Sequence, residues 1–380
     1  MLNIEKIFEE VKPVDHRRIN SKKKHKISIS GNIFCSDSIF LLLEHIQFIR
    51  FNNLKNFHLK ILINTKYIAD ESTLIVFEII IYYLLKNNIC DVTYTFVVDK
   101  NLLGYGSLIM SNLFPYNTKL VNREKFINII EQETHIFKNH FRKICYNNEE
   151  NREGIFLSKL ITDITTFLSA YNIEESYCEE LAEIVTEIVG NSLEHSRDDC
   201  LLDLKIVVDK INKYKNVSVT TISIGDTFIG SNIKDYIYDS ENVIYSPRNK
   251  IVLEALENHK NYFDEYYNID TFSMVSAFQK YVTTRKHTIN SGGTGLTTLI
   301  KQLKSRARAD YCYVLSGKDI ILFREPYLDL TSEGLIGFNK ENNYLQNIPS
   351  KEIVMVNTRK FNGTIYNLSF ILDERNEDDE

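Results

Sequence analysis

The sequence predicts an α+β protein of two domains, and three observations lead to that prediction. Strand-like stretches alternate with helix-like stretches in the first part of the chain, residues 25–145. A polar run, YNNEENR at residues 146–152, separates this part from the rest and is a candidate linker. The remainder combines two helical stretches with several β-rich ones, and 380 residues are enough for two domains of ordinary size.

The N-terminal domain begins with alternating polarity at residues 26–30 (KISIS), which is typical of a half-buried strand. After Gly31, the leucines and isoleucines of SDSIFLLLEHIQFI suit a helix. A second strand (HLKILIN), a mostly apolar helix (TLIVFEIIIYYLLKNN) and a third strand (VTYTFVV) follow. Strands and helices in this alternation form a layered α/β domain, which we expect over residues 25–145 after an extension of residues 1–24.

The second domain is expected over residues 152–372, and it opens with two helices. In FLSKLITDITTFL, apolar residues recur at the spacing of one helix face. The second helix is expected to start at a capping box formed by Asn172 and Glu175 and to run to about His195. The elements expected after it are two β-rich stretches (LLDLKIVVD, NVSVTTISIG), mixed helix and loop, a helix from Leu296, a hairpin (YCYVL-SGKD-IILF), two late strands (KEIVMV, GTIYNLSFIL) and an acidic tail, residues 373–380.

Composition and charge argue against several classes of protein. The formal net charge is −6 with charges of both signs interspersed, so a dedicated nucleic-acid binder is not expected. One basic run, Lys22–Lys26, could contact a phosphate backbone, but such runs are more often solvated faces. The six cysteines show no CxxC pair and no matched Cys/His spacing, so neither a zinc site nor a disulfide framework is indicated.

The chain is also expected to be cytoplasmic and without membrane attachment. Its first residues, MLNIEKIFEEVK, are acidic where a signal peptide would need a basic and then an apolar segment. The longest apolar stretch, Leu74–Leu85, is interrupted by Glu78 and is too short to cross a bilayer.

Glu187 and Asn191 are four residues apart on the predicted helix, so they project from one side at the margin of its apolar stripe. A carboxylate there can orient or deprotonate a water, and an amide oxygen is a suitable ligand for Mg²⁺. Taken alone, this spacing is also typical of an ordinary polar helix face.

Asp226 follows a β-branched strand in SIGDTFIG, where strand gives way to loop and a side chain can face a cleft. A buried carboxylate there would accept a hydrogen bond from the exocyclic amine of adenine, and Gly230 would let the backbone approach a ligand. The alternative interpretation is an ordinary turn, because Asp and Gly are common turn residues.

A glycine-rich loop, SGGTGL at residues 291–296, runs into the helix LTTLIKQL. Glycines allow backbone N–H groups to surround a phosphate, and a helix N-terminus adds favourable partial charge. The loop fits neither GxxxxGK[ST] nor GxGxxG, and by itself it is also compatible with a simple flexible loop.

The three motifs, ExxxN, D-x-x-x-G and GGTGL, occur in that order on a helix, a strand end and a loop-to-helix junction. In this order they resemble the GHKL superfamily of ATPases, which includes gyrase, histidine kinases, the mismatch-repair protein MutL and the anti-sigma-factor kinases. The resemblance covers residues 152–372 and extends to Gly363 and Thr364, which are similar to the GT-containing strand that closes that fold. It implies a Bergerat-type α/β sandwich, a mixed sheet with helices on one face, that binds ATP and Mg²⁺.

The resemblance also implies roles by position. Glu187 would be the general base or water-orienting residue, Asn191 the magnesium ligand, and Asp226 the adenine-binding carboxylate. The ATP lid would lie between residues 233 and 290, and Arg285 within it would approach the phosphates. The phosphate-binding loop would comprise Gly292, Gly293, Thr294, Gly295 and Leu296.

Two features depart from the family pattern. Its members usually have DxGxG, whereas Phe228 stands at the middle glycine here, which puts the shape of the adenine pocket in doubt. No phosphoacceptor-histidine segment is evident, since neither His135 nor His140 lies in a recognisable dimerisation helix pair. A two-component histidine kinase is therefore not indicated.

The N-terminal domain resembles the STAS domain of anti-sigma-factor antagonists in its order of strands and helices. Their D-S-S-G-L turn would align with Asp70–Leu74, which puts Ser72 at the phosphorylatable serine. Glu71 and Thr73 replace the first serine and the glycine, and a serine near a helix start is also commonly a cap.

We therefore expect an ATP-binding, magnesium-dependent regulatory protein that hydrolyses ATP slowly and signals to a protein partner through lid closure. One alternative is a serine protein kinase of the anti-sigma type, acting on a STAS-like domain in trans or on its own Ser72. Another is a non-catalytic nucleotide-sensing module, in which Phe228 marks a pocket that binds nucleotide but turns it over poorly. Homodimerisation is implied by the resemblance alone.

Overall fold

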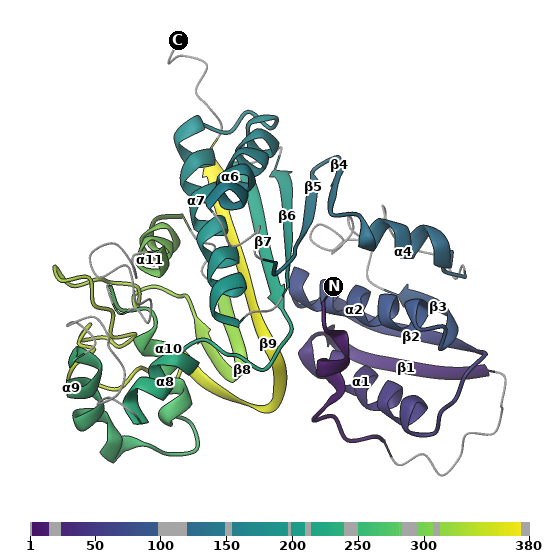
Figure 1. The fold of residues 1–380 in the computed structure, drawn as a ribbon, viewed down its shortest axis with the longest axis horizontal. Coiled ribbons are helices and arrows are strands. Elements are labelled where there is room, and N and C mark those ends of the chain that lie inside the picture. Colours follow the sequence, from purple (N-terminus) through teal and green to yellow (C-terminus); the bar gives the residue numbers. More distant parts are fainter. Residues whose placement is uncertain are drawn as a thin grey trace. The chain divides into compact units, whose positions relative to one another are not determined.

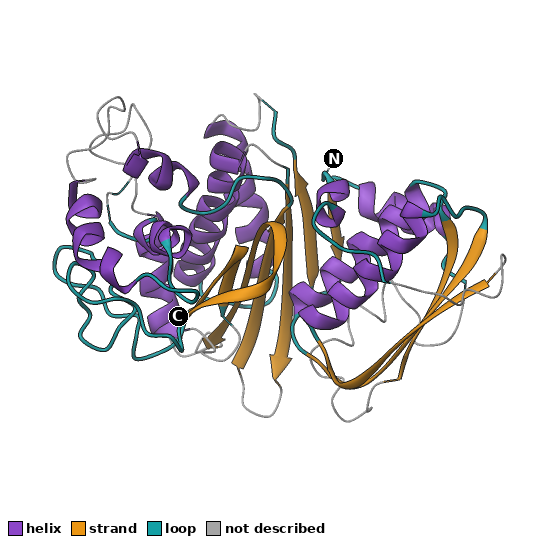
Figure 2. Cartoon of the chain, turned by 90° about the horizontal axis from the view of Figure 1, so that it is seen from below, coloured by secondary structure: helices purple, strands orange, loops and turns teal. Residues whose placement is uncertain are grey.

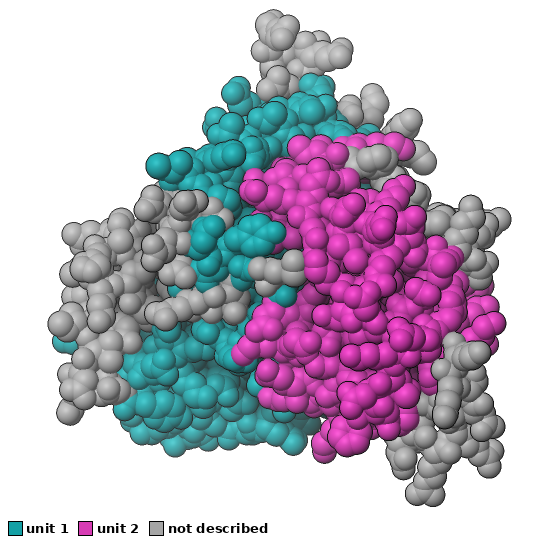
Figure 3. Space-filling model, turned by 45° about the vertical axis from the view of Figure 1, so that its right-hand side comes forward, with its two compact units in different colours: residues 1–2, 145–380 teal, residues 3–144 magenta. Residues whose placement is uncertain are grey.

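The computed structural model forms two compact units. In chain order, what we call the first unit is Asn3–Ile144, magenta in Figure 3, and the second is Cys145–Glu380 with the first two residues, teal in Figure 3. The fold is α+β, as predicted, with a parallel sheet in the first unit and antiparallel strand pairs in the second. The residues that the structure describes are 2–14, 24–97, 120–148, 154–196, 199–209, 214–238, 250–280, 282, 295–306 and 312–373.

The first unit contains every strand and helix that the sequence predicted for it. The three strands pair in the order β1-β2-β3, and both pairings are parallel. Helices α1 and α2 lie on one face of this sheet (Figure 2), and alternate side chains of each strand are buried under them. The elements are β1 (Lys24–Phe34), α1 (Ser36–Phe51), β2 (Phe57–Ile68), α2 (Glu71–Lys86) and β3 (Cys90–Val97).

A short segment near the start of the chain belongs to this unit, which begins at Asn3. A 3-10 turn, η1 (Ile4–Phe8), buries three apolar side chains, and the Tyr83 hydroxyl of α2 donates to Glu5 over 2.9 Å. Past β3 come α4 (Arg123–Glu131) and an antiparallel hairpin of β4 (Thr134–Phe137) and β5 (His140–Cys145).

The second unit places helices on one face of a sheet in which the strands run in the order β6-β7-β9-β8 (Figure 1). The described pairings of these strands are antiparallel, so the mixed sheet expected from the sequence is not found there. For β6 and β7 the antiparallel pairing follows from their connection, which is too short for the crossover that parallel strands need. The elements are α6 (Gly154–Ser169), α7 (Glu175–Asn191), β6 (Cys200–Asp209), β7 (Tyr214–Ser223), α11 (Gly295–Arg306), β8 (Tyr313–Leu322) and β9 (Val354–Asp373).

Two predictions about the last strands are wrong. The hairpin expected at SGKD is one continuous strand, β8, and the two expected late strands are one long strand, β9. Ser316 pairs with Thr364, whereas Asp319 pairs with Val356, so the register shifts twice around Gly317. Gly and Asp are common in bulges as well as in turns, and Gly317 and Asp319 lie at a bulge in β8.

The predicted capping box before α7 is also wrong. Asn172 has a left-handed backbone (φ 54°), and its carbonyl oxygen accepts a 2.9 Å hydrogen bond from the Lys215 ammonium. Glu174 is the N-cap, and its side chain makes no capping hydrogen bond. Asn tolerates the left-handed conformation that this tight connection requires, so its role is in the turn.

A set of short helices completes the second unit: α8 (Ser231–Tyr238), α9 (Lys250–His259), the 3-10 turn η5 (Lys260–Tyr262) and α10 (Ile269–Ser276). Their core is aromatic. The His259 ring packs edge-on against Phe272, and its Nδ1 lies 2.7 Å from the Tyr267 hydroxyl. Among the described residues, no helix is both long and apolar enough to cross a membrane.

Candidate functional site

Helix α7 carries Glu187 and Asn191 near its C-terminal end. Its predicted apolar stripe is buried, whereas Glu187 and Asn191 are half-buried at the margin. Burial, and to a lesser extent the charge of Glu187, raises the pKa of the Tyr366 phenol on β9. The Glu187 carboxylate is therefore close enough to the sheet to act on Tyr366. The buried stripe comprises Leu181, Ile184, Val185 and Ile188.

Directly after Asn191 the helix widens. Residues Ser192–Ser196 form a π-helical turn, and the Ser192 hydroxyl donates to the Ile188 carbonyl oxygen over 3.1 Å. Single π-helical turns are rare and occur frequently at functional sites. The widened turn gives the end of α7 a backbone geometry that a regular helix would not have.

The loop after β7, residues 224–230, is fixed to the neighbouring strands. The Ile229 N–H donates to Ser316 Oγ of β8 over 2.9 Å, and that oxygen lies 2.8 Å from Thr364 Oγ1 of β9. Asp226 lies in this loop and is exposed. It is thus at the strand end that the sequence predicted, but the described residues do not bury it.

The strand register shows that the side chains near the Asp226 loop lie on one face of the sheet. Ser223 pairs with Thr364, and Thr364 with Ser316, so the three side chains share a face. Tyr366 lies two residues beyond Thr364 and therefore points to the same face. The face that carries the loop hydrogen bonds is the one that Glu187 approaches.

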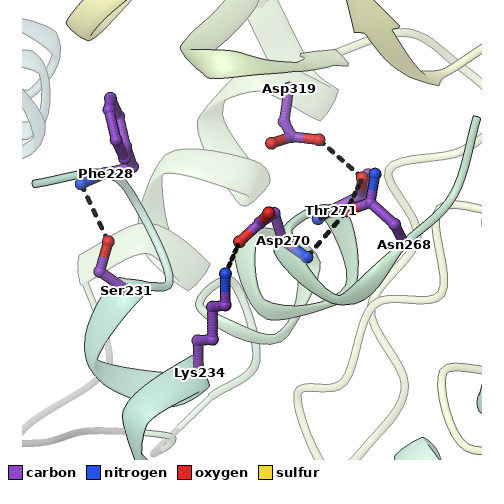
Figure 4. Close-up of polar contacts among 7 residues, drawn as sticks. All are labelled: Phe228, Ser231, Lys234, Asn268, Asp270, Thr271 and Asp319. Carbon is purple, nitrogen blue, oxygen red and sulfur yellow. Dashed lines mark hydrogen bonds and ion pairs between the residues drawn. The ribbon is translucent and has the colours of Figure 1, made fainter. Parts of the chain in front are cut away.

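Phe228, which replaces the expected glycine, packs against the bulge in β8. A side chain added at Gly317 would come within 3.3 Å of the Phe228 ring, and the Lys360 ammonium lies 5.2 Å from the ring centroid. The Phe228 N–H donates to the Ser231 hydroxyl over 3.0 Å, at the start of α8 (Figure 4). The ring thus has a packing role at the edge of the loop.

Gly230 is required by the fold itself. Its φ is +86°, and an added Cβ would lie 2.4 Å from the carbonyl carbon of Ser273 and 2.6 Å from the Met274 nitrogen. The backbone that approaches Gly230 is therefore that of α10, which no sequence motif had suggested.

A polar cluster that sequence reasoning missed lies beside this loop (Figure 4). Asn268 caps α10 by accepting from the N–H of Asp270, and the Thr271 hydroxyl donates to Asp319 of β8 over 2.6 Å. The Lys234 ammonium of α8 contacts Asp270 at 2.5 Å. The cluster links α8, α10 and β8.

Burial, opposed by the Thr271 hydrogen bond, raises the pKa of the Asp319 carboxyl from 3.8 to about 6. A carboxyl with such a pKa exchanges a proton near neutrality. No local pattern indicates this role for Asp319, because SGKD is typical of a turn, where an aspartate is unremarkable.

The glycine-rich loop and its arginine fall largely outside the described residues: Arg285, Gly292, Gly293 and Thr294. Gly295 is described as the first residue of α11, as the loop-to-helix junction predicted, and Leu296 is half-buried. In the same first turn, Thr297 is buried and its hydroxyl has no hydrogen-bond partner among the described residues.

Ser72 lies in the first turn of α2 and is only 3% exposed. Its hydroxyl donates to Asp70 over 2.8 Å, and Asp70 caps the helix by accepting from the Thr73 N–H over 2.8 Å. A kinase would reach this hydroxyl only after the start of α2 had opened.

The possible metal ligands at the end of α7 are the carboxylate oxygens of Glu187 and the amide oxygen of Asn191. Oxygen ligands of this kind suit a hard cation such as Mg²⁺. Within the described ranges, no three His, Cys, Asp or Glu side chains form a cage for a metal ion. A cation there would take its remaining ligands from water and from substrate, as Mg²⁺ commonly does.

Comparisons with family models, with curated proteins and with solved structures found no match to this chain.

Proposed function

We propose that this protein binds ATP with Mg²⁺ in the manner of GHKL ATPases, hydrolyses it slowly and uses the nucleotide state to regulate a protein partner. The observation that carries the proposal is the shared sheet face described above. The charge of Glu187 acts on Tyr366, and the Asp226 loop is hydrogen-bonded to Ser316, which contacts Thr364, so the candidate groups for both ends of a nucleotide border one face of the sheet.

In this proposal Glu187 orients or deprotonates the attacking water. Its half-buried position beside the sheet suits that role, because a general base must be held in place and still be reached by water. The Asn191 amide oxygen would be the protein's ligand to Mg²⁺, and the ion would neutralise phosphate charge.

Asp226 would hold the adenine amine. Because Asp226 is exposed among the described residues, its carboxylate is accessible to a base. The start of α11 would receive the phosphates, since helix N-terminal N–H groups favour anions. The Thr297 hydroxyl in that first turn, which has no hydrogen-bond partner within the described part of the chain, is one further donor, and buried hydroxyls are normally satisfied.

The test separates binding from turnover. Titration calorimetry with a nonhydrolysable ATP analogue and Mg²⁺ measures binding, and a coupled assay of ADP release measures hydrolysis. Glu187→Ala is expected to bind the analogue with little change and to lower turnover roughly 10²-fold or more. Asp226→Asn is expected to weaken binding instead.

Glu183→Ala is the matched control, because Glu183 is an exposed carboxylate one turn earlier on α7. It should leave both measurements unchanged. Equal ADP release by the wild type and Glu187→Ala would refute hydrolysis at this site, and absence of analogue binding would refute the proposal as a whole.

A further inference from the structure

The outer face of the three-stranded sheet, opposite α1 and α2, is open among the described residues (Figure 2). Purely parallel sheets normally have both faces covered and read as continuous apolar runs. Here β1 and β2 alternate, with buried apolar residues on the helix side and exposed polar residues on the other. This outer face is therefore built for a polar environment.

The outer face is basic. Four exposed lysines of β1 and β2 lie on it, and Asp91 is the one carboxylate that the three strands carry. His58 lies among them, with its Nε2 2.9 Å from Thr93 Oγ1. The basic sheet face, as we call this surface, comprises Lys24, Lys26, His58, Lys60 and Lys66.

The strand register aligns these charges. Lys26 pairs directly with Lys60, and Lys24 pairs with His58, so the charges form rows across two strands that lie about 4.8 Å apart. Lys66 lies six residues beyond Lys60 on β2, roughly 20 Å away at about 3.3 Å per residue. The result is an extended line of positive charge, which matches a linear polyanion.

We infer that the basic sheet face binds the phosphate backbone of a nucleic acid. Between the lysines lie small polar residues that contact phosphates and sugars in such complexes. The net charge of −6 averages over the whole chain and conceals this local excess. These small polar residues are Ser28, Ser30 and Asn64, and all three are exposed.

The composition of the basic sheet face favours a nucleic acid over a protein partner or a membrane surface. The cores of protein–protein interfaces are depleted in Lys and Ser and enriched in aromatic residues, the reverse of what is found here. Attachment to a membrane surface needs apolar side chains that enter the lipid, and the central rows of this face offer only Leu62 and Val97.

The test is fluorescence anisotropy of the full chain with labelled short single-stranded DNA, single-stranded RNA and duplex DNA over a range of salt concentrations. The wild type is expected to bind, with log K falling linearly with log salt concentration. The triple variant Lys26→Ala, Lys60→Ala and Lys66→Ala is expected to lose about tenfold or more in affinity and to lower the salt slope by about 2.

A charge-matched control replaces exposed lysines elsewhere: Lys125→Ala, Lys318→Ala and Lys340→Ala. Its affinity should remain within about twofold of the wild type, because counterion release depends on the phosphates contacted. Circular dichroism of both triple variants checks the fold, which exposed side chains should not affect.

No binding by the wild type at low salt, an unchanged basic-face variant, or an equal loss in the control would each overturn the inference. So would tighter binding of polyglutamate than of the oligonucleotide at equal charge, which would identify an acidic protein segment. Retention on phosphatidylserine vesicles without oligonucleotide binding would identify a membrane surface instead.

Discussion

The Thr271 hydroxyl donates a 2.6 Å hydrogen bond to Asp319, and this pair joins the first turn of α10 to β8 at a site where Asp319 is only 9% exposed. The Thr271 hydrogen bond and the charges of Lys234 and Lys318 favour the carboxylate, whereas the charge of Asp270 opposes it. Desolvation outweighs the favourable effects, because the pKa of Asp319 is raised to about 6. The folded protein therefore holds this carboxylate at a cost to its stability above that pH.

Asp319→Asn is expected to stabilise the protein at pH 7.5 by roughly 1–3 kcal/mol, since it keeps an acceptor for Thr271 and removes the buried charge. A raised folded pKa contributes stability that is complete below 3.8 and is lost as the pH rises through about 6. The gain should therefore be absent near pH 3.8, grow up to about pH 6 and then stay constant. Urea unfolding of both proteins across this range measures it.

Thr271→Val is the control for the hydrogen bond, because it removes the donor and keeps the shape. It should destabilise the protein at neutral pH, where Asp319 is ionised. A gain from Asp319→Asn that does not change with pH would show that the charge of Asp319 is not the cause.

His259 is expected to give the opposite pH dependence. It is fully buried, and burial lowers the pKa of its imidazole from 6.5 to about 4. The unfolded chain then binds a proton first, so stability from neutral His259 is present above 6.5 and is lost as the pH falls towards 4. The loss would reach up to roughly 3 kcal/mol.

His259→Gln removes this titration while leaving a side chain that can bond to the Tyr267 hydroxyl. Its free energy of unfolding should be lower than that of the wild type at pH 7 and should converge towards it between pH 6.5 and 4. Urea unfolding at several pH values tests this, and two parallel curves would contradict the assignment.

The sequence predicts most reliably what depends on neighbouring residues. Alternation in KISIS and HLKILIN and the apolar run of α2 predicted the elements of the first unit, and four-residue spacing placed Glu187 and Asn191 together. Pairings between distant segments were missed. Thr271 and Asp319 are 48 residues apart, and Asp319 lies just beyond the bulge at Gly317. No local pattern distinguishes that bulge from a turn.

Glu78 illustrates the same limit, because it interrupts the apolar run of α2 without an evident reason in the sequence. In the structure it forms an ion pair with Arg142 of β5 at 2.7 Å, with side chains 2% and 3% exposed. Burial, and to a lesser extent the charge of Glu78, raises the pKa of the Tyr94 phenol.

Removal of one partner of the Glu78–Arg142 ion pair is expected to destabilise the protein far more than removal of both partners. Glu78→Leu or Arg142→Met alone should cost about 3–5 kcal/mol, because each leaves a buried charge without its partner. The double variant should return close to the wild type, since apolar residues of similar volume can replace a buried ion pair. A double-mutant cycle from urea unfolding measures the coupling, and additive effects would contradict it.

Gly230 and Gly31 form a matched pair for testing backbone strain. An added Cβ at Gly230 would meet the backbone of Ser273 and Met274 at 2.4–2.6 Å, and φ there is +86°. At Gly31, on β1, no heavy atom lies within 4 Å of an added Cβ. Gly230→Ala should therefore cost roughly 2 kcal/mol or more, because the left-handed backbone and the clash both oppose it.

Gly31→Ala should be neutral or slightly stabilising, since alanine reduces the freedom of the unfolded chain without strain in the fold. Thermal unfolding of the two variants compares them directly. Equal stability of Gly230→Ala and the wild type would mean that α10 can move away from the loop. In that case the position of the Asp226 loop would not depend on its packing against α10.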